Sequence, residues 1–583
     1  MNYTVTFMPD NLSVSVPENA TIMDAERMLE LGFEYPCGGN GTCGKCMVDV
    51  TYDDNKTVSL KACTTRVDRD MTVTLKKEKD TEKENILIDS EIVVTDFKPG
   101  IRVLKLSVPE AKVGDVRSDF ERFRAACSEQ FSLDGITFNS VSVLTSMSEI
   151  FAEDIFEVYG VFFENILLDV LKEDVHPLGL SYDVGTTTIA CYLTDLKTGK
   201  QIDSAGDLNR QVRYGGDVVS RCLYAMEHGV SEIKECVNEQ VEELAEKILK
   251  KNKKRPEDVY VVSVVGNTCM HHIFAGINPL SLVNVPYTPS ENSQMVLAAS
   301  DYLKNANKNA KLLLLPVIAG FIGADTVSAI VATEFYNSEK PTLLLDIGTN
   351  GEMVLGTKER WVACSTASGP AFEGAKIEKG MRGAPGAIDH VWMEKNELKY
   401  STIESLPAAG ICGSGLIDII TLMLSEGIIL SSGRFNRRYP EDGPLYDRLQ
   451  TVDGINVFVI APEVYVTQKD VREVQLAKGA IAAGIEIMTE ALSLTYEDIQ
   501  AVLIAGAFGN YMKPESMCGI KMLPPTLLSK IKPVGNAAGR GATVCLLSDE
   551  KWKKSEEVSR RTEFIELATH PQFQSKFISQ LDF

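Results

Sequence analysis

Three cysteines share one glycine-rich loop, Cys37-Gly-Gly-Asn-Gly-Thr-Cys43-Gly-Lys-Cys46, and a fourth, Cys63, follows on the strand-like run Val58 to Thr65. Four thiolates around a metal centre carry net negative charge, so their loop must wrap tightly and aim backbone N–H groups at sulfur. Glycine permits the backbone conformations that such wrapping requires. The loop supplies four glycines, at Gly38, Gly39, Gly41 and Gly44.

This spacing favours an iron–sulfur cluster over zinc. Zinc sites made of cysteines usually consist of two short Cys-x2-4-Cys pairs, whereas three clustered ligands and one distant ligand are typical of plant-type 2Fe-2S ferredoxins. The first spacing is one residue longer than the plant pattern, so the loop resembles the vertebrate-type and oxygenase-type ferredoxins instead. We expect a 2Fe-2S cluster bound by Cys37, Cys43, Cys46 and Cys63.

The residues around this loop predict a small α+β domain over residues 1–78. Tyr3 to Phe7 and Leu12 to Val16 alternate apolar and polar residues, which is typical of the two strands of a hairpin. Thr21 to Leu31 has the pattern of a short helix. Together with the cysteine loop, these elements indicate the β-grasp fold of a 2Fe-2S ferredoxin.

A charged segment follows the first domain. Lys76 to Asn85 contains no apolar residue to bury, so we expect a solvated linker over residues 79–99. A small α/β middle domain is predicted over residues 100–176. It begins with the strand-like run Ile101 to Val108 and ends in an amphipathic stretch near Phe151 to Leu171. Its residue pattern indicates no site.

Beyond residue 177 one pattern occurs twice: a hydrophobic strand ends in aspartate and runs into a turn rich in glycine and threonine. The copies are Leu180-Ser-Tyr-Asp183-Val-Gly185-Thr186-Thr187-Thr188 and Leu343-Leu-Leu-Asp346-Ile-Gly348-Thr349-Asn350-Gly351-Glu352. Glycine lets such a hairpin approach a phosphate closely, while threonine hydroxyls and backbone N–H groups donate hydrogen bonds to its oxygens. Aspartates there would hold Mg2+ through the water molecules that this ion retains.

The pattern therefore predicts two phosphate loops. The expected nucleotide ligands are Asp183, Gly185, Thr186, Thr187, Thr188, Asp346, Gly348, Thr349, Asn350 and Gly351. Asp183 and Asp346 are also the expected Mg2+ ligands. Paired loops of this kind resemble those of the superfamily that contains acetate and sugar kinases, the heat-shock chaperone ATPase and actin. The resemblance implies that residues 177–583 form two ribonuclease-H-like α/β halves that face each other across a nucleotide cleft.

Two later segments are similar to further motifs of that superfamily. Leu503 to Tyr511 resembles the adenosine motif, although Ala505 stands where a double glycine is common. Gly535 to Ala542 opens a final apolar helix, and its small residues would let two helices cross closely at the hinge. The adenosine motif adds three expected nucleotide ligands, Gly506, Phe508 and Gly509.

The whole combination resembles the reductive activators of corrinoid proteins, over essentially the full chain. Segments that look like this family's blocks are Arg213 to Arg221, Gly266 to His271, Gly320 to Thr326 and Gly410 to Asp418. The resemblance implies ATP-dependent, one-electron reduction of the inactive Co(II) corrinoid of a partner methyltransferase corrinoid protein to Co(I). The 2Fe-2S cluster would carry the electron from a low-potential donor, and ATP and Mg2+ are the other implied cofactors.

Two other functions stay open. Activators of 2-hydroxyacyl-CoA dehydratases and aromatic-ring reductases use the same ATPase fold, but they usually hold a 4Fe-4S cluster between two subunits and have no ferredoxin domain. A redox sensor that binds nucleotide without turnover is the third reading. ATP hydrolysis that depends on a corrinoid partner separates the enzyme from the sensor.

The group that activates water for ATP hydrolysis should lie beside the phosphate loops. Asp325 and Glu352 are the best candidates, because each follows an apolar strand into a turn next to an expected loop, and Glu373 is a reserve. His271 and His272 are neighbours on a predicted helix and therefore point in different directions, which argues against a shared metal site.

Composition excludes several other functions. The 583 residues, of which 44% are hydrophobic, form several domains, because single cores stop growing at roughly 250 to 300 residues. A net charge of -22 argues against nucleic acid and membrane surfaces as partners. Neither a signal peptide nor a membrane span is indicated. Most of the 13 cysteines are scattered singly, which suits a reducing cytoplasm. A homodimer is left open.

We expect the isolated protein to be brown-red and to contain a single 2Fe-2S cluster per chain. Iron analysis and low-temperature electron paramagnetic resonance of the reduced protein measure this. Cys63→Ala should abolish the cluster, because each iron needs two thiolates. Zinc or a four-iron cluster in the wild-type chain would contradict the assignment.

Overall fold

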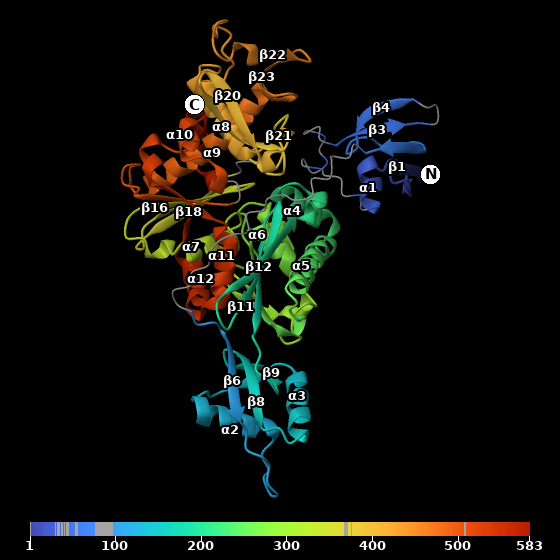
Figure 1. Cartoon of the computed structure of the whole chain (residues 1–583), viewed down its shortest axis with the longest axis vertical. Helices are drawn as coiled ribbons and strands as arrows, with labels where there is room; N and C mark the ends of the chain where they lie inside the picture. The colour runs from blue at the N-terminus through green and yellow to red at the C-terminus, as the bar shows by residue number, and fades with distance from the viewer. Residues whose placement is uncertain are drawn as a thin grey trace.

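The computed structural model in Figure 1 is elongated: the N-terminal domain lies beside the large body, and the middle domain lies at one end of the body. The structure describes residues 2–29, 31, 35, 39, 41, 46–52, 56–75, 97–366, 371–374, 376–506 and 509–583. Several residues singled out in the sequence lie outside the described residues: Cys37, Gly38, Cys43, Gly44, Phe508, the charged run Lys76 to Asn85 and residues 79–96 of the expected linker.

A five-stranded sheet forms the N-terminal domain. Its strands are β1 (Asn2–Met8), β2 (Leu12–Pro17), β3 (Met47–Thr51), β4 (Thr57–Lys61) and β5 (Met71–Thr74), in the order β2-β1-β5-β3-β4. β1 forms the predicted antiparallel hairpin with β2 and pairs in parallel with β5. Helix α1 (Ile22–Met28) starts at a capping box of Thr21 and Asp24 and buries Ile22 and Ala25 in the core. This arrangement confirms the predicted α+β domain.

Cys63 does not lie on a strand, although the run Val58 to Thr65 predicts one. β4 ends at Lys61, whose carbonyl oxygen accepts hydrogen bonds from the N–H groups of Thr64 and Thr65 at 3.2 and 3.0 Å. These bonds close a turn, and Cys63 lies within it. The apolar alternation of the segment therefore continues past the end of the strand.

The middle domain is a four-stranded sheet with two helices. Its elements are β6 (Ile101–Ser107), α2 (Asp119–Phe131), β7 (Thr137–Phe138), α3 (Val141–Ala152), β8 (Glu157–Phe163) and β9 (Ile166–Leu171), and the strand order is β6-β8-β9-β7. The amphipathic stretch near Phe151 to Leu171 is largely the β8–β9 hairpin. Phe123 of α2 stacks on Phe162 of β8, with ring centroids 6.2 Å apart.

Two six-stranded sheets form the body. The first contains β10 (Leu178–Val184), β11 (Thr188–Asp195), β12 (Gln201–Leu208), β13 (Val259–Gly266), β14 (Met295–Ala298) and β15 (Lys311–Leu314). The second contains β16 (Thr342–Ile347), β17 (Gly351–Gly356), β18 (Trp361–Thr366), β25 (Ala501–Ala505), β26 (Ile531–Gly535) and β27 (Glu563–Phe564).

The two sheets repeat one topology. Their strand orders are β12-β11-β10-β13-β15-β14 and β26-β25-β16-β17-β18-β27. Each starts with three consecutive antiparallel strands, and the first of these also pairs in parallel with a later strand, β10 with β13 and β16 with β25. The body therefore has the two ribonuclease-H-like halves that the repeated sequence pattern predicts.

Helices separate and cover the two sheets. α7 (Ala324–Ala332), α11 (Ala537–Leu547) and α12 (Asp549–Arg561) lie between the sheets, where one apolar core includes residues of both (Figure 1). α5 (Ser231–Lys251) and α6 (Thr268–Ala275) pack on the first sheet, and α4 (Val218–His228) lies against α6. α9 (Gln468–Ala491) packs on β17 and β18 of the second sheet.

Two small sheets extend the second half away from the middle domain (Figure 1). One contains β19 (Ala387–Glu394), β20 (Glu397–Thr402) and β21 (Gly410–Ile411), and the other contains β22 (Leu449–Val452), β23 (Ile455–Ala461) and β24 (Val464–Thr467). α8 (Gly413–Ser425) and α10 (Pro514–Gly519) pack together beside them, and α13 (Phe573–Ser579) packs on α9. None of the described helices is long and apolar enough to cross a bilayer.

Small residues let α7 and α11 cross closely. A Cβ atom at Gly541 would lie 2.1 Å from the carbonyl oxygen of Ser328, and the Ser328 hydroxyl donates to the carbonyl oxygen of Ala538 at 2.5 Å. The close helix crossing expected from this segment is therefore present. α11 is not the final helix, however, because α12 and α13 follow it. α12 is rich in lysine and glutamate, so its few buried residues do not form an apolar run.

Gly541→Val should force α7 and α11 apart and lower the apparent melting temperature, because overpacking a close contact costs about 1–3 kcal/mol. Circular dichroism during heating measures this. Gly383→Ala is a matched control, since a Cβ atom there would meet only the Ile403 Cδ1 atom, at 3.8 Å. An unchanged melting temperature in Gly541→Val would contradict the close crossing.

Candidate phosphate-binding cleft and cluster loop

Two of the four expected cluster ligands are described, and they meet. Cys46 and Cys63 are buried, and their Sγ atoms lie 3.1 Å apart as free thiols. Gly39 and Gly41, which precede Cys46 in the same loop, have φ angles of +87° and +69°, which glycine adopts readily. Converging thiols on a glycine-rich turn fit a 2Fe-2S cluster, for which the two cysteines outside the described residues would complete the ligands.

The two expected phosphate loops face each other between the halves. Each begins at the end of a central strand, since Asp183 lies on β10 and Asp346 on β16. The hydroxyl oxygens of Thr187 and Thr349, one from each loop, lie 3.2 Å apart. The other expected loop residues form the two turns or the strand ends beside them: Gly185, Thr186, Thr188, Gly348, Asn350 and Gly351.

One carboxylate joins the two loops. The Thr187 hydroxyl donates to Glu373 Oε2 at 3.0 Å, and the Thr349 hydroxyl donates to Glu373 Oε1. Glu373 is buried, with 6% of its surface exposed. Both loops therefore direct hydroxyl donors at a single anionic group. The reserve candidate from the sequence is thus the acidic residue that touches both loops.

Polar residues from other elements hold the first loop. The Asn209 side-chain amide donates to the carbonyl oxygen of Gly185 at 2.7 Å, and the Asn267 amide donates to the Thr186 hydroxyl at 2.9 Å. The guanidinium of Arg221 donates to the carbonyl oxygen of Thr186 and is fully buried. The sequence assigned these residues no role. The only signal was that Arg221 and Asn267 fall in segments that look like family blocks.

Four carboxylates gather beside the loops, on four different strands and helices. Burial raises the pKa of Asp183 to about 6, although a hydrogen bond from Asn536 opposes this shift. Burial and the charge of Asp183 raise the pKa of Asp325 to about 7. Burial and the charges of Asp325 and Asp183 raise the pKa of Asp346 to about 7. Burial and two of these neighbours also raise the pKa of Glu352.

This excess of negative charge fits a divalent cation. Within the described ranges, no lysine or arginine forms an ion pair with any of the four carboxylates. Asp183 and Asp346 could hold Mg2+ through its waters, which requires carboxylates near the ion but not in direct contact. No group of three potential ligands among the described residues is tight enough to bind a bare ion directly.

The adenosine-like segment touches the second loop. Gly506 has a φ angle of +89°, and a Cβ atom there would lie 2.5 Å from the Asp346 carboxylate. Glycine is therefore required for this close approach. Gly509 is buried at the start of the next turn, whereas Phe508 lies outside the described residues. The Gly506 N–H donates to the carbonyl oxygen of Gly535 at 3.3 Å, which connects this turn to the start of α11.

The two favoured candidates for the water-activating group lie near the loops. Asp325 is in the first turn of α7, and Glu352 pairs with Asp346 in the β16–β17 register. Unlike Glu373, neither of these two described residues forms a hydrogen bond with Thr187 or Thr349. The structure thus brings the sequence candidates to one region without separating their roles.

The adjacent histidines belong to the core of the first half. Their Nδ1 atoms lie 3.4 Å apart, so the two rings approach each other more closely than helix geometry predicted. Burial lowers the pKa of His271 to about 3 and that of His272 to about 4, which keeps both neutral. His272 Nε2 accepts a hydrogen bond from the Ser290 N–H at 3.0 Å. These contacts support a structural role.

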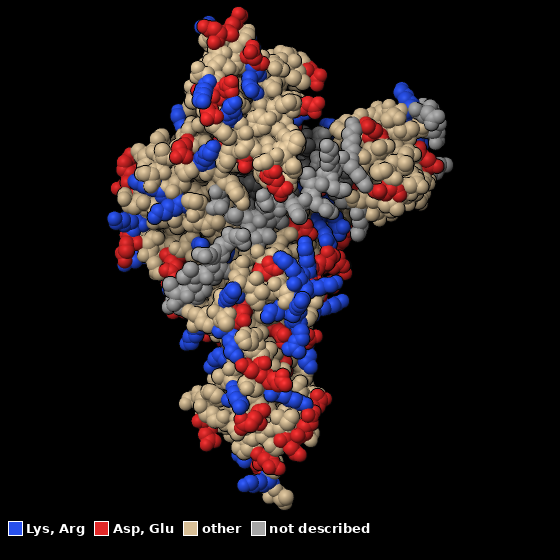
Figure 2. Space-filling model, viewed as in Figure 1, with Lys and Arg blue, Asp and Glu red and all other residues tan. Residues whose placement is uncertain are grey.

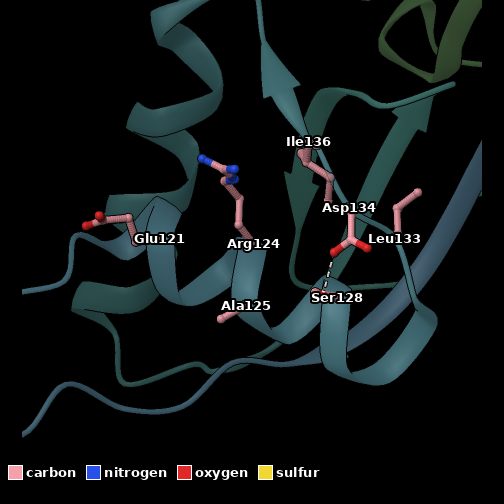
Figure 3. A pocket seen from close by; sticks show the side chains of 8 residues that line it. Glu121, Arg124, Ala125, Ser128, Leu133, Asp134 and Ile136 are labelled. Atoms are coloured by element: carbon pink, nitrogen blue, oxygen red, sulfur yellow. Dashed lines mark hydrogen bonds between the residues drawn. The ribbon is translucent and has the colours of Figure 1, made fainter.

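Two surface features lie away from the loops. Figure 2 shows acidic and basic residues interleaved on the visible face, with many of the basic residues over α5. A hollow of about 280 Å³ lies in the middle domain, and the Ser128 hydroxyl donates to Asp134 there at 2.6 Å. Figure 3 shows the side chains that line it. The charged residues of this hollow are exposed, so we assign it no site.

Family models match four consecutive parts of the chain. A 2Fe-2S iron–sulfur cluster binding domain matches residues 5–68, and the RACo linker region matches residues 91–176. The RACo middle region matches residues 178–338, and the C-terminal domain of RACo, the ASKHA domain, matches residues 340–583.

Known proteins resemble the chain over most of its length. The corrinoid activation enzyme RamQ of Eubacterium limosum is 32% identical over 577 residues, which cover 96% of this chain and 95% of that protein. The [Co(II) methylated amine-specific corrinoid protein] reductase of Methanosarcina barkeri is 24% identical over 446 residues, covering 70% and 77%. A solved reductive activator for corrinoid, iron–sulfur protein matches with a TM-score of 0.77 and 30% identity, covering 100% of this chain and 98% of that chain.

The stability of the metal-free protein should fall as the pH rises from about 4 to about 7. Asp346 has a raised folded pKa of about 7, whereas an unfolded aspartate ionises near pH 3.9. Its contribution is therefore fully present below about pH 4 and is lost as the pH rises through 7. Each such group contributes a slope of up to about 1.4 kcal/mol per pH unit.

Thermal melts in a chelator at several pH values measure this slope. Asp346→Asn should flatten it, and so should saturating Mg2+ with nucleotide, because a cation favours the ionised carboxylates. Asp442→Asn, which removes an exposed aspartate, is the matched control and should leave the slope unchanged. The same slope in the wild type and Asp346→Asn would disprove the raised pKa assigned to Asp346.

Proposed function

This chain belongs to the family of reductive activators of corrinoid proteins, and from that premise we propose that it couples ATP hydrolysis to one-electron reduction. The substrate would be the inactive Co(II) corrinoid of a methyltransferase partner protein, and the product would be Co(I). The electron would come from a low-potential donor through the N-terminal domain. The relatives are named for corrinoid activation and for reduction of a Co(II) corrinoid protein, which supports this proposal.

One observation supports the proposed dependence on ATP: both phosphate loops donate hydrogen bonds to the same carboxylate. Thr187 and Thr349 belong to different halves, yet both hydroxyls donate to the same carboxylate. Donors that converge on one carboxylate are suited to converge on a phosphate group, which also accepts several hydrogen bonds. This geometry supports a nucleotide whose terminal phosphates lie between the halves.

The residues of the cleft would divide the work of hydrolysis. Thr187 and Thr349 would donate to phosphate oxygens, and Asp183 and Asp346 would hold Mg2+ through its waters. Asp325 or Glu352 would orient the attacking water. Burial and neighbouring charges raise the pKa of both carboxyl groups, that of Asp325 to about 7, which favours proton acceptance. Gly506 would bring the adenosine-binding turn against the second loop.

The N-terminal domain would deliver the electron. A 2Fe-2S cluster bound by Cys37, Cys43, Cys46 and Cys63 would supply a low-potential one-electron carrier. The buried thiols of Cys46 and Cys63 would shield it from water. ATP is needed because moving one electron uphill by 100 mV costs about 2.3 kcal/mol, so a gap of a few hundred millivolts exceeds what weak docking supplies.

Mixing the purified protein with a Co(II) corrinoid protein, reductant and Mg-ATP should produce the visible spectrum of Co(I). We expect no Co(I) without ATP, because the electron transfer is energetically uphill. ATP hydrolysis should in turn increase when the corrinoid protein is added. Full reduction without nucleotide would remove the proposed coupling.

Asp183→Ala and Asp346→Ala should each lower ATP hydrolysis and Co(I) formation about a hundredfold or more while leaving the iron content unchanged. Losing a group that fixes Mg2+ and phosphate charge removes several kcal/mol of transition-state stabilisation. Cys63→Ala is the complementary control: it should hydrolyse ATP but form no Co(I). Wild-type ATPase rates in both aspartate variants would refute the assignment of two phosphate loops.

A further inference from the structure

We propose that Glu373 stands in for the terminal phosphate of ATP, and that carboxylate and phosphate compete for the same two threonine hydroxyls. The inference rests on the proposed ATP hydrolysis and concerns how the cleft admits its nucleotide. Glu373 is then a positioning residue that holds the loops together until the terminal phosphate takes its place.

The contacts of Glu373 match those expected of a phosphate. Each carboxylate oxygen accepts from a different loop, Oε2 from Thr187 at 3.0 Å and Oε1 from Thr349. These are hydroxyl donors of the two turns that the sequence identifies as phosphate loops. A hydrogen bond to a charged acceptor contributes more than one to a neutral acceptor. The carboxylate therefore competes effectively with an incoming anion for both donors.

A buried cation supports the same exchange. Arg221 is fully buried and donates to the carbonyl oxygens of Gly215 and Thr186. Burial lowers its pKa to about 10, whereas negative charges nearby, that of Glu373 included, oppose this shift. In the part of the chain that the structure describes, no carboxylate forms an ion pair with Arg221. A buried guanidinium needs negative charge in its surroundings, which either Glu373 or a phosphate supplies.

The two groups cannot share the position. The hydroxyl oxygens of Thr187 and Thr349 are 3.2 Å apart, and the Glu373 carboxylate occupies the position that accepts from both. A terminal phosphate that accepts from both must displace Glu373, and because a tetrahedral phosphate is bulkier than a planar carboxylate, it would move the loops apart. Because these loops end β10 and β16, their separation moves the two halves relative to each other. Exchange of carboxylate for phosphate thus connects nucleotide binding to movement of the halves.

The backbone of Glu373 is anchored, so the exchange requires movement of the side chain. Gly374 has a φ angle of +76°, and a Cβ atom there would lie 2.7 Å from the backbone nitrogen of Met381. The Gly374 N–H donates to the carbonyl oxygen of Ala371 at 3.1 Å, and the Ile377 N–H donates to Gly374 at 3.2 Å. This tight turn fixes the main chain, while the side chain reaches across to both loops.

The test is the affinity of the full-length, cluster-containing protein for a non-hydrolysable ATP analogue and for ADP, each with Mg2+, by calorimetry. Glu373→Gln leaves one oxygen acceptor and no charge, so it cannot accept strongly from both threonines. We expect this variant to bind the analogue about tenfold more tightly, because the phosphate no longer has to displace a charged acceptor from both hydroxyls. ADP lacks the terminal phosphate, so its affinity should change little.

Glu378→Gln is the matched control. It removes the same charge five positions along the same segment, at an exposed residue, and should leave both affinities unchanged. Glu373→Asp keeps the charge but shortens the side chain, so it cannot reach both loops and should also bind the analogue more tightly. This second variant serves as the test if Glu373→Gln does not fold.

Three results would overturn the inference. The first is unchanged or weaker analogue binding in both folded Glu373 variants, with ATP hydrolysis by the wild type intact; that result leaves the proposed function standing. The second is equal tightening for ADP, which would indicate a general loosening of the cleft. The third is a wild-type protein that neither binds nor hydrolyses ATP, which would remove the proposed ATPase function as well.

Discussion

A hydrogen-bonded bridge across the cleft connects the two halves of the body. Thr187 and Thr349 belong to separate sheets, and both donate to the carboxylate of Glu373. That meeting requires one fixed separation of the sheets, which the crossing of α7 and α11 at Gly541 helps to set. Closely packed interiors do not deform continuously, so a change in the group held between the loops moves whole elements. The cleft is therefore suited to convert the occupant of one small position into a rearrangement of two halves.

The charge in the cleft falls into two parts of opposite sign, a group of carboxylates and a buried arginine. Burial and mutual repulsion raise the pKa values of Asp325 and Asp346, while Arg221 is buried close to Glu373 as a cation. A divalent cation neutralises the first part, and a phosphate complements the second. Metal and nucleotide together satisfy both parts, whereas either alone leaves one uncompensated. This asymmetry gives a physical reason for a metal–nucleotide complex as the ligand.

Helix α4 contacts the first phosphate loop and lies on the side of the body that faces the N-terminal domain (Figure 1). Its Arg221 donates to the carbonyl oxygen of Thr186. Three residues further along, Tyr224 has a pKa that burial and Glu232 raise and that the charge of Arg27, on α1, lowers. Arg27 of the N-terminal domain therefore lies close enough to α4 for its charge to lower the pKa of Tyr224 (Figure 1). The helix that contacts the loop expected to bind phosphate is therefore also the one whose Tyr224 is affected by the charge of Arg27.

Patterns of neighbouring residues predicted the cluster domain and the two halves of the body, because both depend on local chemistry. The cysteine spacing predicts a four-thiolate cluster, and the repeated Asp-x-Gly-Thr turns predict two similar halves, since a strand, its turn and their donors are adjacent in sequence. The turn that carries Cys63 was missed because apolar alternation does not show where a strand stops. The bridging contact of Glu373 with Thr187 spans 186 positions, and that of Arg221 with Thr186 spans 35. Only tertiary packing creates such contacts, because no local pattern records which distant side chains the folded sheets bring together.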